Sequence, residues 1–208
     1  MNKIIVDEVE FEIDNIVAAL EIKKEKLRLI SRGENKIDLN VVNSIDLEII
    51  MLDNSKLDLT IFKSCKNSYG KVVIEQHNST NIIYKESFVS NNSNKIVVNN
   101  KIVGNNNKSD IKLRCISFKG EAVIDVLADV KSGTCGNEII EDIKGINYGG
   151  SVEVNPNMEI NTSEVIANHF VTISKISDSD LFYLESKGLS KEKAEELLLD
   201  GFLKSILK

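Results

Sequence analysis

Five side chains in this 208-residue sequence are cysteine or histidine, the residue types that commonly act as nucleophiles, general bases or transition-metal ligands: Cys65, Cys115, Cys135, His77 and His169. The cysteines are widely separated and form no CxxC pair, so neither a disulfide framework nor a zinc site is indicated. No Cys/His or Ser/His/Asp set is compact in the sequence, so only the fold could assemble one. His77 lies beside an asparagine-rich corner and is interpreted as a surface residue. The open question concerns His169, which is either a ligand or a structural residue where strand-like alternation gives way to a helical pattern.

Motifs that bind phosphate or nucleotides are absent. There is no GxxxxGK[ST] or GxGxxG loop, and the glycine-rich "NYGGS" at residues 147–151 lacks the lysine and the helix that would follow it. We interpret that stretch as a tight corner. Only Arg28, Arg32 and Arg114 could offer the rigid fork that anion sites favour. The abundant carboxylates are interpreted as solvated faces of an acidic protein.

The composition sets the class of protein and its partners. A hydrophobic content of 42% is typical of a globular chain, and the length suits one sizeable core with a small appendage. The formal charge of -6 argues against nucleic acid as a partner. No apolar run approaches the roughly 20 residues of a membrane helix, and the acidic start does not resemble a signal peptide. We therefore expect a cytoplasmic protein that contacts neither nucleic acid nor membrane.

Short apolar alternations dominate residues 36–176, for example "KLDLTIF", "DIKLRCISF" and "EAVIDVLADV", and they predict strands of four to seven residues. Asparagine, which tolerates the left-handed conformation of tight corners, separates many of them. These features favour a β-solenoid, whose rungs stack and align like residues. A sandwich or barrel remains the alternative, because no strict sequence period can be counted.

The two ends of the chain differ from this middle part. In residues 1–35, "VDEVEFEID" predicts a strand, whereas residues 15–35 suit either a helix ending at Gly33 or a pair of strands. We therefore divide the chain into an N-terminal strand with an ambiguous segment (1–35), a β core (36–176) and a helical segment (177–208).

The helical segment predicts a hairpin of two helices. Ser177 and Ser190 are N-cap candidates, and Gly188 is the C-cap candidate between them. The second helix carries an apolar stripe at helical spacing: Ala194, Leu197, Leu198, Phe202 and Ile206. So small a hairpin cannot bury all its leucines against itself, so part of this surface must contact the β core or another protein.

The run "HFVTISKISDSDLFYLESKGLSKEKAEELLLDGFLKSIL" resembles the end of the SufB/SufD family, the paired scaffold subunits of the Suf iron–sulfur cluster assembly machine. The matching positions are His169, "TISKI" at 172–176, an acidic pair, "LFYL" at 181–184, "KGLS" at 187–190, and Gly201 with Phe202. Upstream the similarity is patchier. The chain lacks the long N-terminal helical region and the C-terminal tail of full-size members, so the resemblance is to a short or minimal member, or to a shortened paralogue.

The resemblance implies a right-handed parallel β-helix followed by a helical segment. It also implies a non-enzymatic scaffold that forms a homodimer, or a heterodimer with another SufB/SufD-like subunit, and whose helices dock on a SufC-type ABC ATPase. The residues expected to bind that partner are Leu181, Phe182, Tyr183, Leu184, Leu198 and Phe202.

By the same resemblance, Cys135 in "TCGNEIIED" and His169 are the residues expected to hold a transient iron–sulfur cluster. A thiolate is a soft ligand and imidazole a borderline one, so the pair suits that role if a dimer brings it together. An ungapped register instead puts Glu141 opposite the family's cysteine, and Phe170 replaces a glutamate that can follow the histidine. The alternatives are a structural thiol and a structural histidine, in a cluster-free adaptor or regulatory paralogue. A polysaccharide-active β-helix enzyme is disfavoured by the scarcity of arginine.

Overall fold

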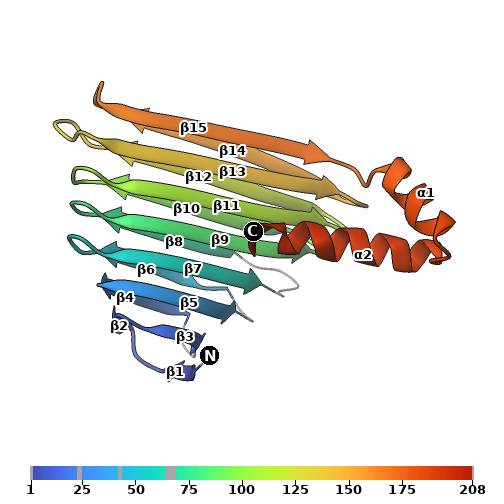
Figure 1. Ribbon diagram of the computed structural model, residues 1–208, viewed down its shortest axis with the longest axis horizontal. Coiled ribbons are helices and arrows are strands. Elements are labelled where there is room, and N and C mark those ends of the chain that lie inside the picture. Colours follow the sequence, from blue (N-terminus) through green and yellow to red (C-terminus); the bar gives the residue numbers. More distant parts are fainter. Residues whose placement is uncertain (1, 23–24, 42–43, 64–68, 208) are drawn as a thin grey trace.

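The structure, a computed structural model, describes residues 2–22, 25–41, 44–63 and 69–207, so Cys65 lies outside the described residues. Within these residues, fifteen strands alternate between two sheets, and two helices and a short 3-10 helix follow them. Figure 1 shows the strands stacked as successive rungs, with the helices at one side. Because the strand pairings are parallel, the predicted β-solenoid is confirmed and the sandwich or barrel alternative is wrong.

The odd-numbered strands form the eight-stranded sheet: β1 (Asn2–Val6), β3 (Val17–Ile22), β5 (Glu34–Val41), β7 (Lys56–Lys63), β9 (Asn81–Ser90), β11 (Lys108–Ser117), β13 (Asn137–Asn147) and β15 (Val165–Ser174). The even-numbered strands form the seven-stranded sheet: β2 (Glu10–Asp14), β4 (Lys26–Arg32), β6 (Asp46–Met51), β8 (Tyr69–Gln76), β10 (Asn94–Ile102), β12 (Glu121–Val130) and β14 (Ser151–Ile160). Each strand pairs with the strand two places away in sequence, so β14 and β15 lie at the same end of the stack.

The core lies between the two sheets and follows from the period-two pattern. In β12, Ala122, Ile124, Val126, Ala128 and Val130 are buried while the residues between them are partly exposed. The other rungs repeat this arrangement with leucine, isoleucine and valine. Burying each large side chain contributes on the order of 1.5–3 kcal/mol, so the inner faces supply the main stabilisation of the solenoid.

The corners use asparagine as the sequence predicts. Asn54 and Asn106 have φ values of 63° and 57°, in the left-handed region. The corners along one edge of the solenoid also form a ladder, in which a side-chain oxygen of one rung accepts a backbone N–H of the next rung. Asp53 Oδ1 accepts from the N–H of Asn78 (2.8 Å), and Asn78 Oδ1 accepts from the N–H of Asn105 (3.0 Å). The "NYGGS" stretch is also a tight corner, in which the N–H groups of residues 148–150 converge on the carbonyl of Ser117.

The described residues of the 15–35 segment form the strands β3 and β4 and the start of β5, so the helix considered for that segment is wrong. Gly33 does not end a helix but forms a corner, with φ at +59°. The outcome follows from tertiary context, because Leu27, Leu29 and Ser31 alternate onto the inner face and complete the solenoid there.

The C-terminal hairpin comprises α1 (Asp178–Ser186), α2 (Lys191–Lys204) and the 3-10 helix η1 (Ser205–Leu207). Ser177 and Ser190 cap the two helices by accepting the N–H groups of the residues three positions on, as predicted. α1 lies beyond the end of the sheets, and α2 runs back over β11 and β9 (Figure 1). Within the described residues, neither helix has the length and apolar character needed to cross a membrane.

The face that α2 buries differs from the predicted stripe at two positions, Leu197 and Leu199. Ala194 and Leu199 are buried, whereas Leu197 is 51% exposed. The helix is oriented by the β strands beneath it, and Leu199 packs there against Ile116 and Ile146. Helical spacing alone does not decide which of Leu197, Leu198 and Leu199 faces the strands.

Candidate functional site at the end of the solenoid

His169 lies on the inner face of the outermost strand, β15. Four and two residues before it on the same face, Val165 and Ala167 pack against buried residues of the preceding rung. Because side chains alternate with period two, His169, Val171 and Ile173 continue that face. They are nevertheless exposed, since β15 is the last strand of its sheet. His169 is thus an inward-directed residue at an open end.

The strand register places Glu141 of β13 directly beside His169. Glu141 has 0% relative exposure, and neither of its carboxylate oxygens has a hydrogen-bond partner within the described residues. Burial raises the pKa of this carboxyl from 4.5 to about 7. A buried carboxyl group and a solvent-exposed imidazole are therefore register partners on adjacent strands.

Cys135 lies in the corner between β12 and β13, where it is half-buried. It takes the next position in the corner ladder: its N–H donates to Asn105 Oδ1 at 2.9 Å, and its carbonyl accepts from Asn106 at 2.9 Å. Cys135 precedes Glu141 by six residues, which corresponds to about 20 Å along an extended strand. Within one chain, Cys135 and His169 are therefore not brought together.

The buried thiol, Cys115, is on β11 and faces neither of these groups across a strand pair, since its register partners are Phe88 and Gly145. Burial raises its pKa well above the ordinary value, which keeps it a neutral thiol. Among the described residues there is no group of three or more His, Cys, Asp or Glu side chains arranged to hold a metal ion.

The residues expected to bind a partner are divided between two environments. Phe182 and Tyr183 on α1 are 71% and 61% exposed, and α1 buries none of its residues. Leu181 and Leu184, on the same helix, are half-buried. On α2, Leu198 is half-buried and Phe202 packs against the cluster that contains Ile116, so Phe202 contacts the β core.

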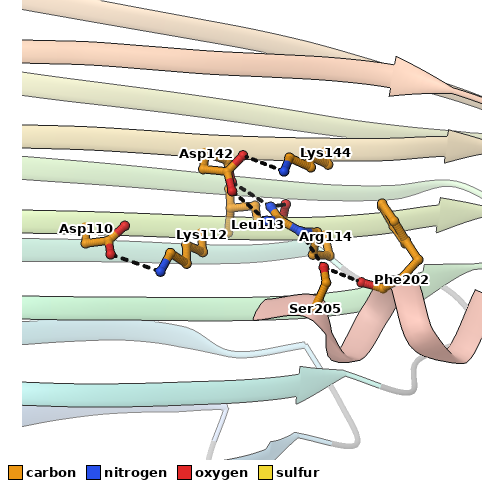
Figure 2. Close-up of polar contacts among 8 residues, drawn as sticks. All are labelled: Asp110, Lys112, Leu113, Arg114, Asp142, Lys144, Phe202 and Ser205. Carbon is orange, nitrogen blue, oxygen red and sulfur yellow. Dashed lines mark hydrogen bonds and ion pairs between the residues drawn. The ribbon is translucent and has the colours of Figure 1, made fainter. Parts of the chain in front are cut away.

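A polar contact that the sequence did not predict attaches the hairpin to the β core (Figure 2). Arg114 on β11 donates from Nη2 to Asp142 Oδ2 at 2.5 Å and from Nη1 to the carbonyls of Leu113 and Asp142, each at 2.9 Å. Its Nε donates to Ser205 Oγ at 3.1 Å. The arginine fork that could have served an anion is thus occupied by a carboxylate and the C-terminal turn. In the sequence, the only signal for this contact is that Arg114 is one of few arginines and lies within a strand-like segment.

A second contact holds the other part of α2. The Tyr148 hydroxyl at the 147–151 corner donates to Glu195 Oε2 at 2.5 Å, and its ring packs against Phe118 with centroids 4.9 Å apart. This bond raises the pKa of Tyr148. Together, the contacts of Arg114 and Tyr148 hold α2 on the eight-stranded sheet and leave α1 projecting with its aromatic residues exposed.

Comparison with known proteins finds a match over the same part of the chain. Residues 146–202 match the family model described as "SUF system FeS cluster assembly, SufBD core domain". That segment contains β14, β15, α1 and most of α2, hence His169 and the six residues expected to bind a partner. Cys135 and Glu141 lie outside it. The resemblance drawn from the C-terminal run is confirmed over this segment.

Several curated proteins are similar to part of this chain. A SufBD family protein of iron–sulfur cluster assembly from Mycobacterium leprae is 42% identical over 53 residues, 25% of this chain and 14% of the relative. Another from Pyrococcus horikoshii is 40% identical over 57 residues, 27% of this chain and 13% of the relative. The cluster assembly protein SufD of Escherichia coli is 26% identical over 98 residues, 46% of this chain and 23% of the relative. The matched segments thus span less than a quarter of each of these relatives.

Proposed function

Because residues 146–202 match the SufBD core domain, we propose that the chain is a non-enzymatic scaffold subunit in iron–sulfur cluster assembly. The observation that carries the proposal is His169, which lies within the matched segment and on the inner face of the outermost strand. An imidazole there is accessible from the open end and has a neighbouring carboxylate, so it suits transient handling of iron. We place the protein in the cytoplasm, with the cluster as its cargo.

The proposed ATPase partner is a SufC-type ABC protein that docks on α1. Phe182 and Tyr183 are exposed, and large aromatic side chains are the usual anchors of protein interfaces. α2 is held on the β core, so movement of a protein bound to α1 would be transmitted to the solenoid. Leu181 and Leu184 complete this surface, whereas Leu198 and Phe202 support it from α2.

The proposed second subunit stacks on the open end of the solenoid. Val171 and Ile173 are exposed there, on the same face of β15 as His169, and Ile160 is exposed at the end of β14. Covering them with a second copy, or with another SufB/SufD-like subunit, would remove apolar surface from water. Cys135 and His169 are too far apart in one chain to share a ligand, so a shared site for them requires this dimer.

The test is anaerobic reconstitution with ferrous iron and sulfide, followed by the visible absorption of the bound cluster. We expect Cys135→Ala and His169→Ala to lower cluster loading, and His77→Ala to leave it unchanged, because His77 is a surface residue paired with Glu75 at 3.2 Å. Equal loading in all the variants would exclude the assignment of these two residues.

Docking is tested by affinity capture of a SufC-type ATPase. We expect Phe182→Ala with Tyr183→Ala to abolish capture, and Tyr69→Ala, an exposed aromatic residue on β8, to leave it intact. Capture that survives the double change would refute α1 as the docking surface.

The second candidate function is a cluster-free adaptor that binds the ATPase. It is favoured by the separation of Cys135 from His169 and by the exposed Phe170 at the position where the family can have a glutamate. Capture of the ATPase without cluster loading under any reconstitution condition supports the adaptor. Cluster loading that depends on His169 supports the scaffold.

A further inference from the structure

Glu141 is a buried carboxyl group that the described residues leave without a partner. Its neighbours on the inner face of β13 are Ile139 and Ile143, both with 0% exposure. Neither carboxylate oxygen accepts a hydrogen bond within the described residues. An ionised carboxylate in apolar surroundings is strongly unfavourable unless a cation or donors compensate it. A buried polar group of this kind therefore points to a binding partner from outside the chain.

His169 is the side chain best placed to share such a partner. The two residues are register partners on adjacent strands, which lie about 4.8 Å apart, and both are on the inner face. Both side chains extend several ångströms from the backbone and can converge on one ion between them. Ile139 and Ile143 enclose Glu141 along its own strand, whereas His169 is exposed. An ion would therefore enter from the open end of the solenoid, past the imidazole.

We propose that Glu141 and His169 together bind one divalent transition-metal ion at the open end of the solenoid, with water in the remaining coordination positions. A carboxylate with an imidazole and open positions is a donor set that suits ferrous iron. The identification of the ion as iron rests on the proposed function, whereas binding of a divalent ion by this pair does not. The chain would thus take up the metal before any sulfide is present.

A site formed by Glu141 and His169 differs in its ligand chemistry from one built on a thiolate. Cys135, the expected thiol, is held in the corner ladder by its backbone, away from His169. Glu141 offers oxygen instead of sulfur at the position beside the imidazole. Oxygen is a harder ligand than thiolate, so this pair suits a hydrated ferrous ion.

The test is titration of the full chain with Fe²⁺ under anaerobic conditions by calorimetry, in the absence of sulfide and ATPase. Air-stable Co²⁺ serves as a second probe through its visible absorption bands. We expect one ion per chain, with affinity at least tenfold weaker in Glu141→Gln and in His169→Ala. The double variant should show no binding at this site, because it keeps neither of the two donors, whereas each single variant keeps one.

The matched controls come from a surface pair of the same residue types, His77 and Glu75. His77→Ala and Glu75→Gln should bind Fe²⁺ as the wild type does. His169 is exposed, so His169→Ala tests the site even if a change at the buried Glu141 disturbs folding. Binding by Glu141→Gln within twofold of wild type, or an equal loss in His77→Ala, would overturn the proposal.

The outcome is distinct from that of the proposed function. If only the proposed metal site is wrong, the isolated chain should bind no metal, while ATPase capture and His169-dependent cluster loading persist. Failure of the proposed function alone would appear as metal binding that depends on Glu141 and His169, without capture of the ATPase and without cluster loading.

Discussion

Arg114 and Ser205 are 91 residues apart in the chain, yet the guanidinium Nε donates to the serine hydroxyl oxygen at 3.1 Å. The Arg114 side chain is only 4% exposed, and the same guanidinium binds Asp142 on the neighbouring strand. One side chain thus joins β11, β13 and the C-terminal turn (Figure 2). The position of the hairpin on the solenoid depends on this contact as well as on the apolar face of α2.

Replacing Ser205 by alanine should destabilise the docked hairpin by about 1 kcal/mol, because a partly buried hydrogen bond to Arg114 is lost. The measurement is the free energy of unfolding from urea titration. Ser186→Ala is the matched control, since Ser186 Oγ donates to the carbonyl three residues earlier, as Ser205 Oγ does, but lies on the exposed α1. A cost equal to that of Ser186→Ala would mean that the Arg114 contact contributes nothing.

Replacing Arg114 by methionine should cost more, roughly 2–3 kcal/mol, because the Asp142 carboxylate loses its principal cation. Lys144 lies 3.6 Å from the other carboxylate oxygen and limits the loss. The same urea titration measures it. Protease cleavage near residue 190 should become faster in this variant, whereas an unchanged cleavage rate would contradict a role of Arg114 in holding α2.

The stability of the metal-free chain should fall as pH rises from about 4.5 to 7. Burial raises the pKa of Glu141 from 4.5 to about 7, so the folded state binds this proton more tightly than the unfolded state. Between these pH values the unfolded chain loses the Glu141 proton while the folded chain keeps it. The free energy of unfolding therefore falls by up to about 3 kcal/mol in all.

Glu141→Gln should abolish that dependence, matching the wild type at pH 4 and exceeding its stability at pH 8. Urea midpoints measured from pH 4 to 8 with a chelator present test this. Glu138→Gln is the control, because Glu138 is on the same strand but faces outward and pairs with Lys108 at 3.3 Å. Parallel profiles for wild type and Glu141→Gln would contradict the assignment.

Alkylation should distinguish two of the cysteines. Cys115 is buried with a raised pKa, whereas Cys135 is in a half-buried corner. Because the thiolate is the reactive form, iodoacetamide should modify Cys115 at least tenfold more slowly than Cys135 in the folded protein. Peptide mass spectrometry resolves the two sites, and equal rates that become no faster in urea would refute the burial of Cys115.

Asn105→Ala should loosen the corner that contains Cys135, because it removes the acceptor of the Cys135 N–H. We expect a global cost of about 1 kcal/mol and a faster alkylation of Cys135. Asn91→Ala, at an exposed position in another corner, should change neither quantity. An unchanged rate at Cys135 would show that the ladder does not restrain it.

Alternation and asparagine corners were enough to predict a solenoid, but not its rungs. The ladder residues Asp53, Asn78, Asn105 and Cys135 are spaced by 25, 27 and 30 residues, so equivalent positions drift and no strict period can be counted. For the same reason, the neighbour of His169 could be identified only from the register. The ungapped register with the SufB/SufD family does indicate Glu141, by placing it opposite the family's cysteine. Its burial and its lack of a partner depend on three-dimensional packing.

The helical hairpin was predicted better at its caps than at its contacts. Ser177 and Ser190 cap their helices, and Gly188, with φ at 91°, directly follows the C-cap residue Lys187, so these local positions follow from the neighbouring sequence. The environments of Leu197, Leu199 and Phe202 depend on which surface of β9 and β11 lies beneath them. The contact of Arg114 with Ser205 could not be predicted, because nothing near either residue in the sequence identifies the other.

The corner ladder also bears on how the loss of one rung would spread through the solenoid. In the row that contains Asp53, each acceptor side chain lies on the rung before the backbone N–H that it receives. A second row runs the other way, because Asn107 Oδ1 accepts the N–H of Thr80 and Asn137 Oδ1 accepts the N–H of Asn107. Each of these rungs is therefore bonded to both of its neighbours, so deleting one would leave unpaired polar groups on the rungs on either side.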